Sequence, residues 1–433
     1  RAPGYVSTVT FVCLMAFTFV LILSPQEHFT ALKPLHLAQL FAMLAGGFYL
    51  RDRFRYGAPP PAGLSEYTWV ALLVLWAIVT VPLSIWPGGS VNTITELFLK
   101  AVITFWLLGR VVNTPERLKM AAWILALCSV FLSFSAVKTF FSGGFANYMA
   151  SAGPDRISGY ESGLAANPNG LALVLVLILP LTLALVPLAK RFALKVLLVA
   201  FAVLDVVAIF ATYSRGGFLA LVTALVVYAI VLWRRGNRTA VMLLVLLGVA
   251  AVPMLPDSYT NRLDTIVAYQ EDQSGSAEAR LEGMTLAAGY TLRNPVIGTG
   301  IGMDMLALNE LRDTNKWHHV HDVYLRYSME LGLPGLALFL LLFYSVLKGC
   351  NRARRFSAAR KTPQQRNLFF LSEGLLVSLI TFGVAAVFYP AAYQFYFFYF
   401  AGLAAAAKTI AQRLETNEAE THQCDTSEVS TMA

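Results

Sequence analysis

The chain has 433 residues, of which 57% are hydrophobic and 13% are charged, and its mean hydropathy is +0.62. This balance excludes an ordinary soluble domain and predicts a protein that crosses a membrane several times. The formal net charge is +8. We attribute this charge to the cytoplasmic loops of a membrane protein and to contact with anionic membrane lipids, and not to nucleic-acid binding.

Long apolar runs recur along the chain, and most could cross about 30 Å of hydrocarbon as helices that rise about 1.5 Å per residue. No alternating pattern of the barrel type occurs, so an all-α polytopic membrane protein is expected. About twelve transmembrane helices are predicted, near residues 5–23, 35–50, 67–86, 93–110, 120–141, 168–188, 193–213, 216–233, 239–256, 333–349, 368–388 and 391–409.

Lys and Arg are distributed unevenly over the connections between these runs. Of the 33 basic residues, 22 fall on one side and 10 on the other, with Lys100 inside a span. Positive charge marks the cytoplasmic side, so both termini are predicted to be cytoplasmic. The predicted organisation is nine spans over 1–256, an outward (periplasmic) helical cap over 257–332, three spans over 333–411, and a polar, disordered cytoplasmic tail over 412–433.

The outward connection from 257 to 332 is too long for a structureless loop, so we expect it to fold. Residues 276–293 predict an amphipathic helix, whose apolar stripe is suited to lying on the bundle or on the membrane surface. The glycine-rich stretch 295–302 has a weak likeness to a phosphate-binding loop. Close packing of the backbone is the simpler interpretation of its glycines.

Three of the six histidines lie in the stretch WHHVHD, residues 317–322. The sequence that follows predicts a short helix over 322–331, closed by Gly332, with Pro334 in the first turn of the next span. His321 would then stand just before a helix N-terminus, which favours a neutral imidazole. His321 is therefore our candidate for a general base.

The residues around this base candidate have several interpretations. His318 and His319 could bridge lipid headgroups and water. His319 and Tyr324 are also candidates for binding substrate. A zinc site that uses Asp304 and Asp313 is another alternative, but no recognised ligand spacing supports it.

Arg215 falls between two apolar runs that are joined by almost no loop. A charged side chain at that depth is costly unless it pairs or faces water, so Arg215 is a functional candidate, with headgroup snorkelling as the alternative. Its guanidinium matches phosphate oxygens, and Gly216 and Gly217 let a bulky ligand approach the backbone.

Further outward residues add to a candidate anion-binding and sugar-binding site. Arg280 lies on the predicted amphipathic helix, which could present it to the bundle. Arg156 and Arg262 are additional candidates, although Arg262 could instead pair with Asp264 on the surface. Asn169 stands at the start of the sixth span, where it could cap the helix or hydrogen-bond a sugar hydroxyl.

These candidates share the outward face, where a lipid-linked anionic donor would lie. No paired carboxylates are placed to hold a divalent ion for a nucleotide-sugar donor, and neither a metal nor a cofactor is predicted. A polyprenyl pyrophosphate suits the residues better. Its tail partitions into lipid, and its diphosphate calls for cations and is a good leaving group.

The order of four stretches resembles that of the bacterial O-antigen ligase and polymerase superfamily over roughly residues 160–345: NPNGLAL, YSRGG, RLEGMTLAAGYTLRNPVIGTGIG and HDVYLRYSMELGLPGL. The resemblance implies a metal-independent, inverting glycosyltransferase of the GT-C type in a bacterial inner membrane. It would transfer a glycan from undecaprenyl pyrophosphate to a hydroxyl of lipid A–core oligosaccharide at the periplasmic face, completing lipopolysaccharide. By the same resemblance, His321 is the catalytic histidine, and Arg215 and Arg280 bind the diphosphate.

Other functions remain open at this point. An O-antigen polymerase or a protein O-oligosaccharyltransferase of the same superfamily would use the same donor chemistry. The single large outward cap, without a further soluble domain, favours the ligase. A flippase for lipid-linked oligosaccharides is a rival from another class, but the chain has no visible internal repeat and its long connection faces outward.

Overall fold

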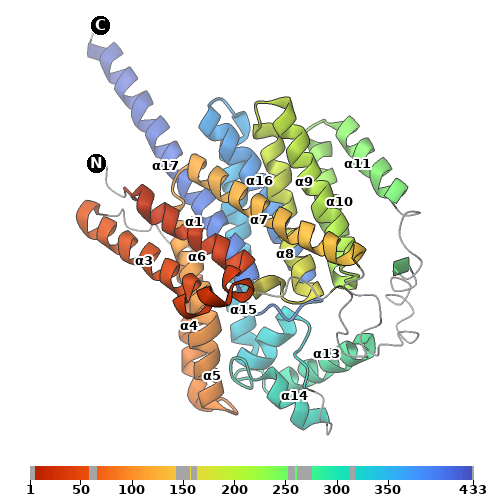
Figure 1. Cartoon of the computed structure of the whole chain (residues 1–433). Helices are drawn as coiled ribbons and strands as arrows, with labels where there is room; N and C mark the ends of the chain where they lie inside the picture. The colour runs from red at the N-terminus through yellow and green to blue at the C-terminus, as the bar shows by residue number, and fades with distance from the viewer. Residues whose placement is uncertain are drawn as a thin grey trace.

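The computed structural model describes residues 5–57, 66–142, 157, 163–251, 259–260, 276–312 and 317–431. These residues form an all-helical polytopic membrane protein, in which long helices stand side by side and shorter helices cover one end (Figure 1). The C-terminus lies at the opposite end of this bundle. The prediction of an all-α polytopic membrane protein is thus confirmed.

Eight helical segments of the described chain are long and apolar enough to cross a membrane. They comprise α4 (Glu66–Thr80) with η2 (Val81–Leu83); α5 (Pro87–Thr93), the π-helical η3 (Ile94–Phe98) and α6 (Leu99–Val111); α7 (Pro115–Phe141); α8 (Pro168–Leu185) with η5 (Val186–Leu188); α9 (Phe192–Ala211); α10 (Arg215–Arg234); α15 (Val323–Phe356) with η8 (Ser357–Ala359); and α16 (Pro363–Ala385). The other helices are α1 (Thr8–Leu23), α2 (Pro25–His28), η1 (Thr30–Leu35), α3 (Leu37–Tyr56), η4 (Gly163–Ala165), α11 (Arg238–Ala251), α13 (Ser276–Arg293), α14 (Asp304–Arg312) and α17 (Phe395–Thr431).

Each of the twelve predicted apolar runs coincides with a helix, but four of these helices fall outside the eight candidate spans. Helices α1 and α11 are apolar but short. Helix α3 ends in the charged sequence RDRFR. Twelve crossings therefore stay a prediction.

The C-terminal segment differs from the predicted disordered tail. Residues 412–431 continue α17 as helix in the structure. The sequence from Arg413 to Thr431 contains neither proline nor glycine, the two residues that most strongly end a helix. Figure 1 shows this end of α17 projecting away from the bundle.

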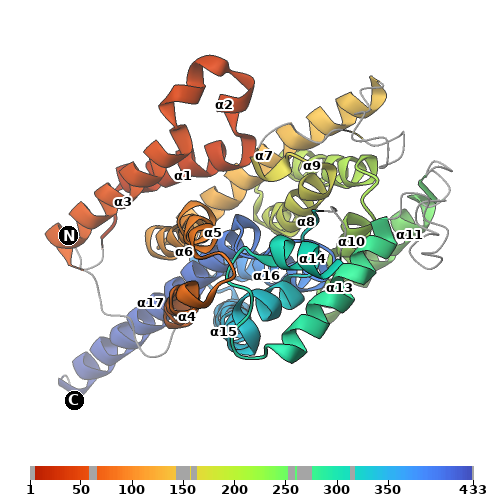
Figure 2. The same cartoon turned by 90° about the horizontal axis from the view of Figure 1, so that it is seen from below.

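Helices α8 and α16 form the centre of the bundle, with 83% and 78% of their apolar segments buried. Helix α8 is apolar on all sides, as expected of a helix that other helices enclose. A small residue brings the pair together, because a Cβ at Gly374 would lie 2.8 Å from the carbonyl oxygen of Pro180. Figure 2 shows α1 and α3 paired at one edge of the bundle and α11 at the opposite edge.

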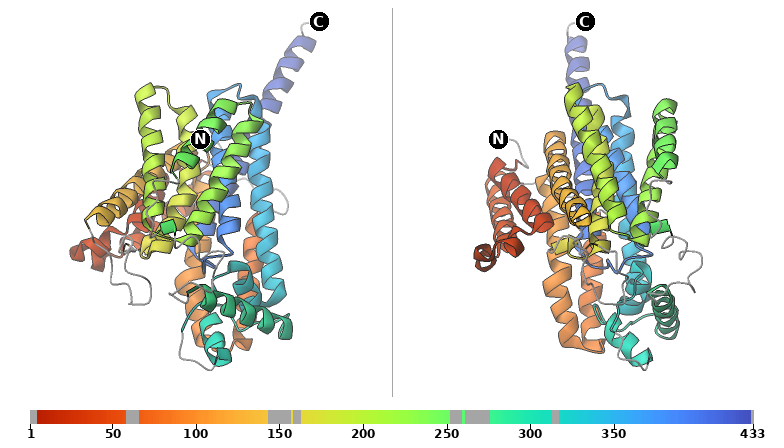
Figure 3. Two further views of the ribbon diagram at one scale, coloured as in Figure 1. Left: turned by 90° about the vertical axis from the view of Figure 1, so that its right-hand side faces the viewer. Right: turned by 45° about the vertical axis from the view of Figure 1, so that its right-hand side comes forward.

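Helices α13 and α14 and residues 317–331, here called the end region, lie across one end of the bundle (Figure 3). They share a small apolar core that includes Ala287, Leu308, Val320 and Met329. The predicted helix over 276–293 is confirmed as α13. Its apolar stripe is not its packed face: Leu281 and Leu292 are 51% and 82% exposed, whereas Ala287 is buried.

The short helix predicted over 322–331 is also present, as the first part of α15. The Asp322 side chain caps it by accepting a hydrogen bond from the Leu325 amide (2.9 Å). Gly332 interrupts the helix with φ 68°, a left-handed conformation that side chains disfavour. The Leu331 carbonyl at this break accepts a hydrogen bond from the indole of Trp76 (2.8 Å).

The glycine-rich stretch before α14 attaches the end region to the start of α5. The Ile85 amide donates to the Thr299 carbonyl (3.0 Å), and the Ser90 hydroxyl donates to the Ile301 carbonyl (3.0 Å). A Cβ at Gly300, whose φ is 96°, would collide with the side chain of Ser84. The interpretation of these glycines as a packing device is confirmed.

Candidate functional site

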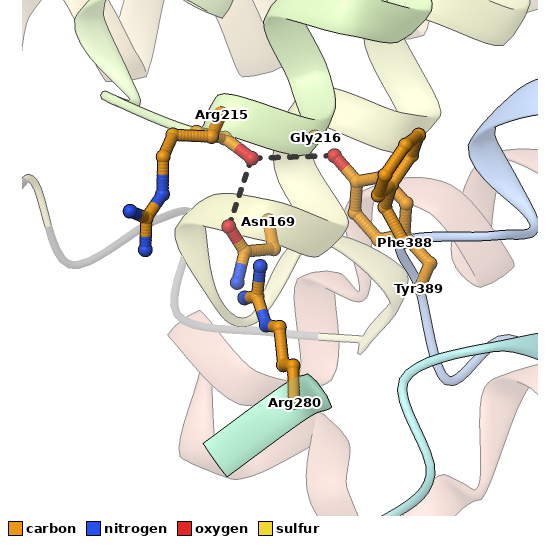
Figure 4. A pocket seen from close by; sticks show the side chains of 7 residues that line it. Asn169, Arg215, Gly216, Arg280, Phe388 and Tyr389 are labelled. Atoms are coloured by element: carbon orange, nitrogen blue, oxygen red, sulfur yellow. Dashed lines mark hydrogen bonds between the residues drawn. The ribbon is translucent and has the colours of Figure 1, made fainter. Parts of the chain in front are cut away.

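An open pocket lies between the bundle and α13 (Figure 4). It brings together candidates from α8, α10 and α13, which are far apart in the sequence, with two aromatic residues from the loop that precedes α17. The lining residues are Asn169, Ser214, Arg215, Gly216, Arg280, Phe388 and Tyr389.

The tight turn between α9 and α10 fixes the position of Arg215. Tyr213 takes a left-handed backbone conformation, φ 51°, which is unusual for a bulky residue. The Ser214 hydroxyl caps α10 by accepting from the Gly217 amide (3.1 Å), donates to Asn169 Oδ1 (2.8 Å), and lies 3.3 Å from the Tyr389 hydroxyl. One serine therefore joins three walls of the pocket.

Arg215 is the first residue of α10 and is only 8% exposed. The N-terminus of a helix carries a partial positive charge, so the guanidinium and the helix end favour the same anion. Gly216 keeps the opposite wall close, because a Cβ there would lie 3.1 Å from the Tyr389 ring and 3.3 Å from Phe388 Cβ. The pocket thus has a cationic and an aromatic side.

Arg280 reaches the same pocket from α13. Figure 4 shows its side chain extending from α13 toward Asn169, while Arg215 extends from α10. Two guanidinium groups carried by different parts of the molecule therefore border one small space. This arrangement suits a ligand with several anionic oxygens, such as a diphosphate.

Asn169 does not cap α8, so that alternative was wrong. Asn167 is the cap, and its side chain accepts a hydrogen bond from the Gly170 amide (2.8 Å). Pro168 takes the first helical position, which makes the residue before it the natural cap. Asn169 instead lines the pocket, where its oxygen accepts from Ser214.

His321 lies immediately before the capping residue of α15. Its Nδ1 is 2.8 Å from the His319 carbonyl oxygen, which can only accept, so Nδ1 carries the proton and Nε2 keeps a lone pair. Burial, followed by the positive charge of Arg280, lowers the pKa of His321 from 6.5 to about 4. The imidazole is therefore neutral near pH 7, as a general base requires.

Arg280 connects this histidine to the pocket, since its charge acts on His321 and its side chain borders the pocket. His321 itself is not among the residues that line the pocket. Asp322, beside it, is committed to capping α15, and burial raises the pKa of its carboxyl group.

The other predicted substrate-binding residues make structural contacts or lie outside the described chain. His319 Nδ1 lies 3.0 Å from Asp304 Oδ1, and the Tyr324 hydroxyl donates to the Gly383 carbonyl (2.7 Å). Their role toward substrate stays a prediction. Arg156 and Arg262 lie outside the described residues.

Two groups of residues beside the site were missed by the sequence analysis. Phe388 and Tyr389 belong to a short uncharged loop that gives no local signal. Arg326 and Glu330 did give one, because they are charged residues four positions apart at the edge of a long apolar segment. Both are buried and hydrogen-bonded to each other (2.9 Å).

Within the described ranges, no three His, Cys, Asp or Glu side chains gather in a way that could hold a metal ion. Asp304 and His319, which entered the zinc alternative, contact each other. Asp313, the third residue of that alternative, is not among the described residues.

Residues 200–340 match a family model described as O-antigen ligase. This range runs from α9 into α15 and includes Arg215, Arg280 and His321. No curated protein matches the chain.

Proposed function

We propose that the chain is an O-antigen ligase, a glycosyltransferase that uses undecaprenyl pyrophosphate as its glycan carrier, because residues 200–340 match a family model of that description. The acceptor is a hydroxyl of lipid A–core oligosaccharide, and the product is complete lipopolysaccharide. The reaction is metal-independent and takes place at the periplasmic face of a bacterial inner membrane.

The pocket of Arg215 and Arg280 is the observation that carries this proposal. Two arginines from different helices border one open pocket next to the N-terminus of α10. Each planar guanidinium can bind two phosphate oxygens at once. A diphosphate could therefore bind with its lipid tail still in the bilayer.

His321 supplies the base in this scheme. Its Nε2 accepts the proton of the acceptor hydroxyl while that oxygen forms a bond to the anomeric carbon of the donor glycan. The bond between this carbon and the diphosphate oxygen breaks, and its electron pair leaves with the diphosphate, whose charge the two arginines stabilise. Attack from the side opposite the leaving group inverts the anomeric centre, as in a GT-C enzyme.

The low pKa of His321 is consistent with a base that becomes stronger when the donor binds. Arg280 is one cause of the low pKa. A diphosphate bound to Arg280 would offset that positive charge and raise the pKa of His321. Donor binding would thus prepare the enzyme to deprotonate the acceptor.

Transfer from purified undecaprenyl-pyrophosphate glycan to lipid A–core, in detergent with EDTA, tests the proposal. The parent protein should modify lipid A–core, whereas His321→Ala should not and His318→Ala should. His318 is a matched control because it is an exposed histidine in the same segment. Longer glycan on the polyprenyl carrier in place of modified lipid A–core would identify a polymerase, and transfer to a protein hydroxyl would identify a protein O-oligosaccharyltransferase.

A further inference from the structure

Three charged side chains form a buried cluster beneath the His321 segment: Asp304, the first residue of α14, and Arg326 and Glu330 of α15. Their exposed fractions are 0%, 3% and 0%. The Arg326 guanidinium lies 3.4 Å from Asp304 Oδ1 and 2.9 Å from Glu330 Oε1. Buried charges are costly, and a well-packed apolar cluster could often replace them without loss of stability. Their presence beside the proposed site therefore calls for a role beyond stability.

Toward the site, Asp304 holds the backbone and side chain of the segment that carries His321. Asp304 Oδ2 accepts a hydrogen bond from the Val320 amide (2.8 Å), and both carboxylate oxygens lie within 3.1 Å of His319 Nδ1. Burial alone would raise the pKa of Asp304, but Arg326 and these hydrogen bonds lower it well below its ordinary value. The ionised carboxylate thus fixes residues 319 and 320.

A further hydrogen bond in this series, from His321 to the His319 backbone, sets the tautomer of the proposed base. The carbonyl of His319, one residue before the amide that Asp304 holds, accepts the proton of His321 Nδ1 (2.8 Å). Any movement of this carbonyl would release the ring and allow the proton to occupy Nε2. In that tautomer Nε2 could no longer accept a proton from the acceptor hydroxyl.

Toward the bundle, the same cluster contacts the loop that supplies the aromatic wall of the pocket. Arg326 Nη1 lies 3.4 Å from the Pro390 carbonyl, directly after Tyr389. Outside the cluster, the Val323 amide at the start of α15 also contacts this loop, by donating to the Ala386 carbonyl (2.7 Å). The cluster therefore spans the distance between the His321 segment and the pocket wall.

We propose that Asp304 is a positioning residue, which acts through His319 and Val320 to hold His321 in the tautomer and place that glycosyl transfer requires. This inference rests on the proposed function of His321. Asp304 does not line the pocket, so it has no direct contact with the diphosphate in this scheme. Its effect should appear in turnover and not in donor binding.

The test is a double-mutant cycle of Asp304→Asn with His321→Ala, measured by the transfer assay with the full chain in detergent. Asp304→Asn should lower kcat by about 10- to 100-fold and leave the donor KM within about twofold, because a small misplacement of a reacting group has effects of that size. The double variant should be no slower than His321→Ala alone, because no ring remains to be positioned.

Asp52→Asn is the matched control, since Asp52 is also a buried aspartate and accepts hydrogen bonds from the Ser7 amide (2.7 Å) and the Thr10 hydroxyl (2.8 Å). It belongs to α3, which contributes nothing to the pocket. Its thermal stability should fall as that of Asp304→Asn does, with kcat unchanged at a temperature where both are folded.

A second variant keeps the test decisive if Asp304→Asn does not fold. His319→Ala removes a partly exposed ring and keeps the backbone carbonyl, and it should lower kcat severalfold without raising the donor KM. Normal turnover of Asp304→Asn, a further loss when it is combined with His321→Ala, or a His319→Ala effect on KM alone would overturn the proposal. A parent protein that transfers no glycan would instead refute the proposed function.

Discussion

The bundle and the end region contribute the two halves of the proposed site by different physical means. Arg215 and Asn169 belong to helices whose place follows from apolar packing and from a serine that joins them. Arg280 and His321 belong to a region with a small apolar core and a buried ion cluster. Apolar packing places a helix, whereas the orientation of one imidazole depends on hydrogen bonds to charged groups. The comparison predicts that donor binding depends on one arginine from each half, whereas turnover depends on the His321 segment of the end region.

The largest effect should come from the end region. His321→Ala removes the proposed base, and general base catalysis contributes about 10²- to 10⁴-fold, so kcat should fall by that factor. The donor KM should change little, as measured from initial rates of transfer. If this variant and His318→Ala were both fully active, the end region would take no part in the chemical step.

The loss in free energy of unfolding should also differ between the end region and the bundle. Arg326→Met leaves Asp304 and Glu330 buried without the guanidinium, which should lower the free energy of unfolding by about 3–5 kcal/mol. Glu373→Gln, in the bundle, alters a carboxylate that pairs with Arg235 and Arg354, which are partly exposed. Its loss should be about 1–2 kcal/mol. Denaturation in detergent checks the order, and equal losses would contradict it.

Substituting each of the two arginines tests how much the bundle and the end region each contribute to binding the diphosphate. Arg215→Lys and Arg280→Lys keep the positive charge but lose the planar fork, so kcat/KM should fall by about 10- to 100-fold in each. Arg293→Lys, on the exposed end of α13, is the control and should remain within about twofold of the parent. If both site variants kept parental kcat/KM, bidentate binding would be excluded.

The pH dependence should follow His321, whose pKa is about 4 in the free protein. Only the neutral ring accepts a proton, so kcat/KM should stay level from pH 7 to 5 and fall as pH drops through about 4. Arg280→Gln should move this fall to higher pH, because a nearby positive charge that disfavours imidazolium is lost. A fall already complete at pH 6 in the parent would argue against His321 as the base.

The smallest effect concerns the aromatic wall of the bundle half. Gly216→Ala would place a Cβ 3.1 Å from the Tyr389 ring, so the ring must shift by a few tenths of an ångström. We expect the donor KM to rise about two- to fivefold with kcat nearly unchanged. Gly289→Ala on α13 is the control, since its Cβ would meet no atom within 4 Å. An effect on kcat alone would mean that the aromatic wall contributes to turnover and not to donor binding.

Local patterns predicted much of this molecule. The limits of α13, the short helix after Asp322 and the break at Gly332 follow from caps, proline and glycine. The wrong assignment of a cap to Asn169 could have been avoided, because proline prefers the first helical position and Asn167 precedes it.

Long-range contacts account for what the sequence did not predict. Ser214 and Tyr389 are 175 positions apart, and Asp304 and Val320 are 16 positions apart. The spacing of apolar residues along the sequence does not indicate which distant residues will be in contact. Nothing in the sequence indicated that Asp304 would hold the segment of His321, because that contact exists only after α14 has packed beside α15.

The break at Gly332 has a consequence for the depth at which glycan transfer would occur. Only residues 323–331 separate it from the His321 segment, and at about 1.5 Å per residue they can raise that segment by no more than about 13 Å. Trp76, which binds the carbonyl at the break, is of the residue type that gathers where hydrocarbon meets headgroups. With the break at that level, the proposed reaction would stay in a thin layer over one face of the membrane, and a lipid-anchored donor and a lipid-anchored acceptor could meet by lateral diffusion without either leaving the membrane.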